Sequence, residues 1–150
     1  MGDRCDVYIQ IPAEYKDQVT HILDPTQHWE TVHGLAEFCI PEVNYANIEA
    51  ETQALTREGI PHSWYWTPGG GYDSGKGYVR FTAEGEVIYH DYSDPDVNPC
   101  IDHVIKLLET KTSEEVLEYL REYKAKYSPQ SWDNQVEYGK VYKLKQLVSQ

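Results

Sequence analysis

The chain reads YVRFTAEGEVIYHDY over residues 78–92, and this stretch predicts a β-hairpin at the centre of the fold. Two runs rich in β-branched and aromatic residues, 78–83 and 86–92, flank a Glu-Gly dipeptide that suits a tight turn. A two-residue turn there pairs Phe81 with Ile88 and Val79 with His90. One face of the hairpin would then hold Val79, Phe81 and Ile88, and the other Tyr78, Arg80, Val87, Tyr89 and Asp91.

Outward from the hairpin, alternation of apolar and polar residues predicts strands at 6–11, 35–40 and 62–66. Helical spacing of apolar residues predicts four helices. The first lies between Pro12 and Asp24, and the second begins at an Asn44 N-cap and ends at Gly59. The third follows the Asn-Pro pair at 98–99, and a Thr-x-x-Glu capping box at 112–115 opens the fourth.

Residues 128–150 alternate in a way that favours a C-terminal strand with a short tail. Val141, Leu144 and Val148 would also fit one face of a helix, so that alternative stays open. Helices interleaved with strands, and neighbouring hairpin strands in the middle, are typical of an α+β protein. We therefore expect one α+β domain over residues 1–150, with a mostly antiparallel sheet, a central hairpin and about four helices.

Acidic residues are concentrated in the first two-thirds of the chain. Residues 1–105 carry 18 Asp and Glu against 5 Lys and Arg, whereas residues 106–150 carry 7 against 8, and the whole chain has a net charge of −12. The negative electrostatic field of this charge repels nucleic-acid phosphates and attracts basic surfaces. We therefore expect a host protein with a basic surface as the partner and no direct nucleic-acid binding. The chain has neither a membrane-length apolar run nor an apolar leader, which predicts a cytoplasmic protein without membrane contact.

Two stretches imitate ligand-binding loops but are incomplete. Residues 70–76 fit the G-x-x-x-x-G-K pattern of a phosphate loop, yet Gly77 stands where Ser or Thr is required and a strand pattern follows. Asp94 and Asp96 resemble the start of a calcium-binding EF-hand loop, but Pro99 replaces its glycine. A looser cation site that adds Asp91 is a minor alternative, and we predict no metal or cofactor.

One cluster could in principle support nucleophilic catalysis. His90, Asp91, Cys100 and His103 would have to converge in space, and sequence separation alone does not show this. We interpret these residues as structural and predict that the protein is not an enzyme.

The aromatic composition favours a recognition surface, with four Trp and thirteen Tyr but only two Phe. His62, Trp64 and Trp66 would share one face of their strand, where they either pack as core or form an open platform beside the glycine-rich loop. The predicted partner-binding residues are Trp64, Trp66, Tyr72, Asp73, Glu84, Glu86, Asp91, Asp94 and Asp96.

A small-molecule alternative uses the same loop to sequester a nucleotide or similar ligand. Lys76 and Arg80 are the cations nearest the loop in sequence, and Tyr78 lies between them. These three residues are the ligand-binding set under that alternative.

A run of about 40 residues resembles small phage- and plasmid-encoded accessory proteins. It extends from Asn44-Tyr45 through Gly59-Ile60-Pro61 to residues 69–72 and 80–85. The resemblance implies an anti-defence inhibitor of anti-CRISPR or anti-restriction type, which would occupy a nucleic-acid-binding groove on a host protein. An immunity protein against a toxic nuclease would need the same acidic surface and is a further alternative. Because residues 106–150 are nearly neutral, mimicry of phosphate charge would be confined to one face.

Overall fold

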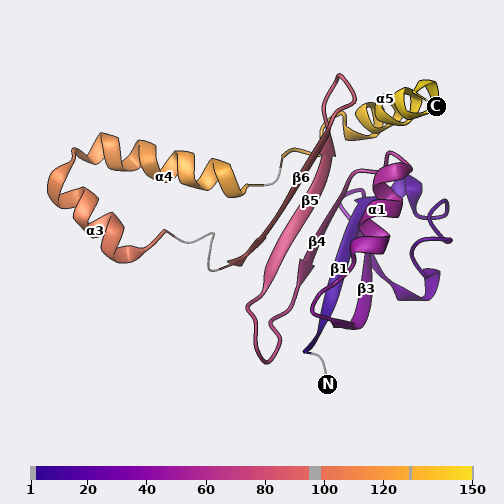
Figure 1. The fold of residues 1–150 in the computed structure, drawn as a ribbon, viewed down its shortest axis with the longest axis horizontal. Helices are drawn as coiled ribbons and strands as arrows, with labels where there is room; N and C mark the ends of the chain where they lie inside the picture. Colours follow the sequence, from indigo (N-terminus) through magenta and orange to yellow (C-terminus); the bar gives the residue numbers. More distant parts are fainter. Residues whose placement is uncertain (1–2, 95–98, 129, 150) are drawn as a thin grey trace.

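Six antiparallel strands form one sheet in the order β2-β3-β1-β4-β5-β6 (Figure 1). The computed structural model describes residues 3–94, 99–128 and 130–149. The strands, in sheet order, are β2 (His28–Val32), β3 (Leu35–Asn44), β1 (Arg4–Pro12), β4 (His62–Trp66), β5 (Gly75–Phe81) and β6 (Val87–Ser93). The α-helices within these residues are α1 (Glu49–Arg57), α3 (Ile101–Thr110), α4 (Ser113–Tyr127) and α5 (Gln135–Val148). The predicted α+β architecture is confirmed.

The core lies between α1 and the middle of the sheet. Val7, Ile9 and Ile11 alternate along β1 and are fully buried, as period-two burial requires of a strand with one covered face. Leu55 of α1 packs in the same cluster, together with Phe38 of the neighbouring strand β3. Figure 1 shows α1 lying over β1 and β3, so this helix covers one half of the sheet face and leaves the β5 and β6 half beside it.

The central hairpin forms, but its predicted register is wrong by one residue. Phe81 pairs with Val87 and Val79 with Tyr89. The reason is a longer turn, because the amide of Thr82 donates to the carbonyl of Glu86 and three residues lie between them. Gly85 takes the left-handed conformation that closes such a turn, with φ of +74°. The extra residue moves Val87, Tyr89 and Asp91 onto the face of Val79 and Phe81, and moves Ile88 to the other face.

Two helix predictions differ from the structure near the N-terminal half of the sheet. The segment after β1 forms a short 3₁₀ helix, η1 (Ala13–Tyr15), and separate turns instead of a continuous α-helix, while Val19 and Leu23 still reach the core. Asn44 ends β3 and is not a helix cap. α1 begins at Glu49, whose amide donates to the Asn47 side chain at 3.1 Å. The expected strand at 35–40 is part of the longer β3, and β2 precedes it as a strand that the sequence pattern did not indicate.

Two other predicted helix boundaries, at Gly59 and at Thr112, are confirmed. Gly59 ends α1 with φ of +69°, and its amide donates to the Thr56 carbonyl at 2.9 Å, as in a glycine C-cap. Thr112 and Glu115 form the predicted capping box of α4. The predicted start of the third helix at Asn98 lies outside the described residues, and α3 begins at Ile101.

The C-terminal segment is a helix, so the prediction of a strand there is wrong. Buried Gln135 opens α5, and its side-chain amide accepts from the Phe81 amide at 2.8 Å and donates to the Phe81 carbonyl at 3.0 Å. One side chain therefore satisfies both backbone groups at the end of β5, as a neighbouring strand would. Tyr138 and Tyr142, one helical turn apart, pack against the core. These contacts override the weak alternation of the sequence.

Close packing of two glycines places α5 at the end of the sheet, beside the C-terminus of α1. A Cβ atom on Gly139 would overlap the carbonyl oxygen of Gly59. Lys143 of α5 also pairs with Glu58 at 2.5 Å, next to the same contact. No helix among the described residues is both long and apolar enough to cross a bilayer.

The glycine contact gives the first testable prediction. Helix propensity alone would make Gly139→Ala stabilising by about 1 kcal/mol. Because the added methyl group meets backbone atoms of Gly59, we expect the opposite sign, a loss of about 2 kcal/mol in the free energy of unfolding. Urea unfolding measures this, with the exposed α5 substitution Gln146→Ala as the control; a stabilised Gly139→Ala would contradict the packing.

Candidate functional site

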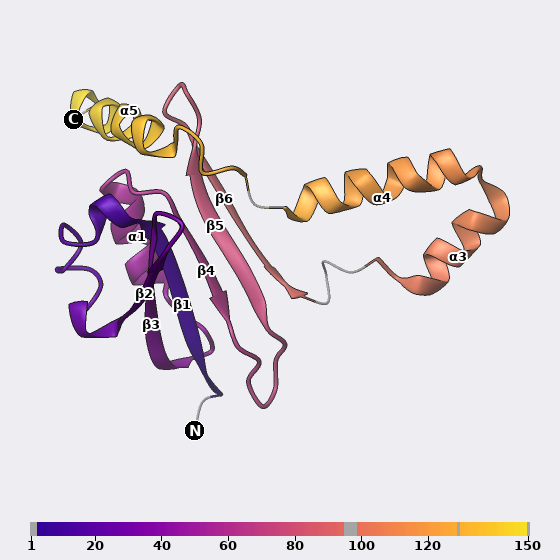
Figure 2. The same cartoon turned by 180° about the vertical axis from the view of Figure 1, so that it is seen from behind.

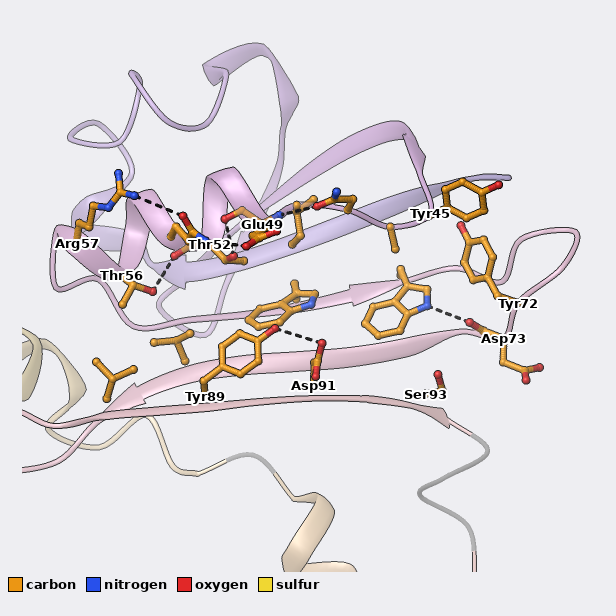
Figure 3. Close-up of a pocket in the computed structure, with 18 residues that line it drawn as sticks. Tyr45, Glu49, Thr52, Thr56, Arg57, Tyr72, Asp73, Tyr89, Asp91 and Ser93 are labelled. Atoms are coloured by element: carbon orange, nitrogen blue, oxygen red, sulfur yellow. Dashed lines mark hydrogen bonds between the residues drawn. The ribbon is translucent and has the colours of Figure 1, made fainter. Parts of the chain in front are cut away.

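An open cleft of about 990 Å³ lies between α1 and the outer half of the sheet (Figure 3). It is lined by the turn at 45–48, by α1, by β4, by residues 72–73 and by β5 and β6. The cleft exists because α1 covers β1 and β3 but does not extend over β5 and β6. Segments that are distant in sequence therefore present side chains to one volume.

Two tryptophans from β4 form part of the cleft wall. Trp64 pairs with Gly77 of β5, and Trp66 pairs with Gly75. A Cβ atom on either glycine would overlap the ring of its paired tryptophan, so the rings occupy the space where side chains of β5 would stand. Trp64 is 5% exposed and belongs to the core cluster, whereas Trp66 is half-buried. The sequence left open whether these rings pack in the core or form an open platform. Both rings pack against the core, and both also line the cleft.

Tyrosines supply the more accessible aromatic surface. Tyr89 on β6 is 55% exposed, and its ring lies 5.7 Å from that of Trp64. Tyr45 and Tyr72 lie close together at the end of the cleft nearest the glycine-rich loop (Figure 3). Burial raises the pKa of the Tyr72 hydroxyl, so this group stays neutral across the physiological range.

Two carboxylates on opposite sides of the cleft raise the pKa of the Tyr89 hydroxyl. Tyr89 donates to Asp91 at 3.2 Å, and Glu49 lies across the cleft at the start of α1 (Figure 3). Burial, the charge and hydrogen bond of Asp91, and the charge of Glu49 together raise the pKa of Tyr89 to about 12. With Asp73, these acids give the described lining three carboxylates against one guanidinium, that of Arg57. The cleft therefore has a formal charge of −2.

The structure brings together five of the nine predicted partner-binding residues. Trp64, Trp66, Tyr72, Asp73 and Asp91 all line the cleft. Tyr45, Glu49 and Tyr89 were missed. The shared face of Tyr89 and Asp91 was predicted, but the error in hairpin register placed that face on the side of the sheet opposite Val79, away from the cleft.

The remaining predicted acids lie elsewhere. Glu84 and Glu86 lie at the hairpin tip, where Lys145 of α5 binds the Glu84 carbonyl at 2.9 Å and the Glu86 carboxylate at 2.5 Å. Asp94 accepts from the Ser74 hydroxyl at 2.6 Å. Asp96 lies outside the described residues.

The residues of the small-molecule alternative are on the other face of the sheet. The Arg80 guanidinium is buried, donates to the His62 carbonyl and the Ser63 hydroxyl at 2.8 Å each, and stacks 3.7 Å from the centre of the Trp132 ring. Burial lowers its pKa to about 10. Lys76 lies 5.8 Å above the Tyr92 ring. None of these groups lines the cleft.

The loop that resembles a phosphate loop holds a carboxylate of the chain itself. The amide of Gly70 donates to Asp3 at 2.7 Å, and the amide of Gly71 donates to the other oxygen of the same carboxylate. β5 follows this loop as a strand, so the structure provides no helix N-terminus for a phosphate there. Within the described residues, no group of three or more His, Cys, Asp and Glu side chains could hold a metal ion.

Comparison with protein-family models, curated proteins and solved structures gave no match. Function is therefore inferred from the cleft and its charge.

A side chain at Gly77 should displace the Trp64 ring, which forms part of the cleft wall. In Gly77→Ala the new methyl group overlaps the Trp64 ring, so we expect the ring to move toward solvent. The expected result is red-shifted tryptophan emission and a loss of about 2 kcal/mol in unfolding free energy. Gly70→Ala is the matched control, because its methyl group would meet only the end of the flexible Asp3 side chain at 3.2 Å. Equal spectra for both variants would contradict this account of the wall.

The buried His62 ring lies 5.7 Å from the Trp64 ring, and its titration should make stability depend on pH. Its ring is fully buried and its pKa is lowered to about 4, mainly by burial and also by the Arg80 charge. In the unfolded chain a histidine titrates near pH 6.5, so between these values the unfolded state binds the additional proton. Stability should therefore fall as the pH drops from about 6.5 toward 4, by up to about 3 kcal/mol from this group.

Urea unfolding across this pH range measures the effect. His62→Gln should reduce the slope of unfolding free energy against pH, whereas replacement of the exposed His33 by Gln should leave it unchanged. An unaltered slope in His62→Gln would show that other groups cause the dependence.

Proposed function

We propose that this protein is a small, acidic, non-enzymatic inhibitor that binds a basic, nucleic-acid-binding surface of a host protein, of anti-CRISPR or anti-restriction type. The observation that carries the proposal is the cleft, in which Trp64, Trp66 and Tyr89 stand beside the carboxylates of Glu49 and Asp91. No cofactor, direct contact with nucleic acid or membrane contact is part of the proposal.

The chemistry of the cleft suits a basic side chain. A cation over an aromatic face is attracted by the ring quadrupole, and this interaction strengthens as water is excluded. An arginine or lysine side chain that enters between Glu49 and Asp91 would meet Tyr89 and the edge of the tryptophan wall. Its charge would also offset the like charges of the two acids, which repel each other in the free protein.

The acidic surface and the aromatic cleft would act on different steps of binding. A net charge of −12 accelerates the encounter with a basic surface and makes the association rate depend on salt. Burial of an anchor against the aromatic rings would slow dissociation. Inhibition would follow because the occupied surface is no longer free for nucleic acid.

Two alternatives remain as outcomes of the test. An immunity protein against a toxic nuclease would use the same acidic cleft, and differs only in its partner. A nucleotide-sequestering protein could place a base against the tryptophans, but Lys76 and Arg80 are on the opposite face of the sheet and the cleft charge opposes a phosphate.

The test uses a short arginine-rich peptide as the probe, and fluorescence anisotropy as the readout. Glu49→Gln combined with Asp91→Asn should weaken binding by about tenfold or more, because each lost charge pair near an aromatic cleft contributes on the order of 1 kcal/mol. The matched control is Glu30→Gln with Glu122→Gln, which removes the same charge from exposed positions outside the cleft. We expect the control to weaken binding by only about twofold.

Two results would overturn the proposal. One is a wild-type affinity for the peptide that does not change between about 50 mM and about 500 mM salt. The other is equal loss in the cleft variant and its control, which would indicate a general field without a site. If ATP bound with saturation and competed with the peptide, the sequestration alternative would replace the inhibitor.

A further inference from the structure

Strand β6 is both an edge of the sheet and a wall of the cleft (Figures 1 and 2). It is last in the strand order and pairs with β5 on its inner side. Val87, Tyr89 and Asp91 of β6 line the cleft and are exposed. Helix α4 approaches β6 at Tyr92, whose ring lies 5.3 Å from that of Tyr127 on the face away from the cleft. The cleft and the outer edge of β6 therefore form one continuous surface.

The hydrogen bonds of the hairpin show which backbone groups of β6 point outward. The Thr82 amide donates to the Glu86 carbonyl at 2.9 Å, and the Asp94 amide donates to the Ser74 carbonyl at 2.8 Å. In an antiparallel pair, positions bonded in this way recur at every second residue. Residues 87, 89, 91 and 93 therefore direct their amides and carbonyls away from β5. Within the described part of the chain, no hydrogen bond uses these outward groups.

The residues with outward backbone groups are also the β6 residues whose side chains line the cleft. In an antiparallel pair, two residues that exchange hydrogen bonds have their side chains on the same face of the sheet. A chain that paired with the outer edge of β6 would therefore point every second side chain toward the cleft. The residue opposite Asp91 and the residue opposite Tyr89 would be two such neighbours.

The two edges of the sheet differ in how well they are protected against such pairing. β2, at the far edge, has five residues and a register shift between His28 and Glu30. β6 has seven residues, contains neither proline nor lysine, and pairs with β5 over residues 87–93 without a register shift. Short strands, irregular pairing, proline and lysine are the usual protections of an edge. β6 is thus the edge that is open to another strand.

Charge decides which chain suits this edge. Two copies of this protein paired through β6 would place two clefts side by side, each with a formal charge of −2, on chains of net charge −12. A basic segment would instead offset the charges of Asp91 and Glu49 as it pairs. The edge therefore favours a basic chain over a second copy.

We propose that the basic partner of this protein binds as an extended segment, which adds to β6 as an antiparallel strand and points alternate arginine or lysine side chains into the cleft. This inference rests on the proposed function and adds the conformation and the sequence pattern of the bound segment. Main-chain hydrogen bonds to β6 would supply affinity for any extended chain, and the alternate basic side chains would supply specificity. A basic side chain opposite Asp91 would lie beside the Tyr89 ring.

The first experiment compares two peptides of about nine residues, the length of a typical strand. One alternates arginine and threonine, and the other has the same composition with all its arginines at one end. Because only the alternating peptide can place every arginine on the cleft face, we expect it to bind about tenfold more tightly by fluorescence anisotropy.

Backbone methylation of the alternating peptide tests the added strand without any change in charge. In antiparallel pairing the arginine amides face β6, whereas the threonine amides face away from it. N-methylation of the arginine residues should weaken binding by at least about tenfold, because it removes donors to the strand. N-methylation of the threonine residues is the matched control and should change binding by no more than about twofold.

Amide hydrogen exchange of the full-length protein locates the contact. The Tyr89 and Asp91 amides should exchange rapidly in the free protein and become protected when the alternating peptide binds. The Ile88 and His90 amides, which already face β5, should be protected in both states and serve as the internal control.

Three results would overturn the added strand: equal affinity for the two peptides, a greater loss from threonine than from arginine methylation, or unchanged exchange at Tyr89 and Asp91. Each of them is compatible with peptide binding that still depends on Glu49 and Asp91, so the proposed function would stand. Absence of peptide binding, or binding that Glu49→Gln with Asp91→Asn does not weaken, would overturn the proposed function and the added strand with it.

Discussion

The contact of tryptophan rings with a glycine-containing strand is the constraint on which the cleft depends. Trp64 and Trp66 lie over Gly77 and Gly75, so β5 presents no side chains of its own at those positions. Any larger residue would fill the space or push the rings away. The same contact lines the cleft with aromatic surface. Function, as proposed, thus rests on two missing Cβ atoms.

The opposite face of the sheet holds the strands in place for that contact. Buried Arg80 satisfies its guanidinium with the His62 carbonyl, the Ser63 hydroxyl and the Trp132 ring, and so ties β5 to β4 and to the segment before α5. Gln135 then pairs with both backbone groups of Phe81. A cation that looked available for a ligand in the sequence is therefore a structural element, because its burial demands that every donor be used.

Two of the chain's acidic residues, Glu49 and Asp91, line the aromatic cleft. Glu49 and Asp91 come from a helix and a strand that are far apart in sequence, yet both act on the Tyr89 hydroxyl. Local concentration of negative charge beside aromatic rings is more selective than a diffuse acidic surface, because only a cation that also fits the rings benefits fully.

The sequence by itself determined the class of fold, the charge and two of the helix ends. Strand alternation in β1, the glycine cap at Gly59 and the capping box at Thr112 depend on near neighbours, so pattern alone identified them. Only the tertiary structure decided the hairpin register, the helical state of α5 and the face on which Arg80 lies. Each depends on contacts across long sequence separations, such as Gln135 with Phe81 and Gly139 with Gly59, which no local pattern contains.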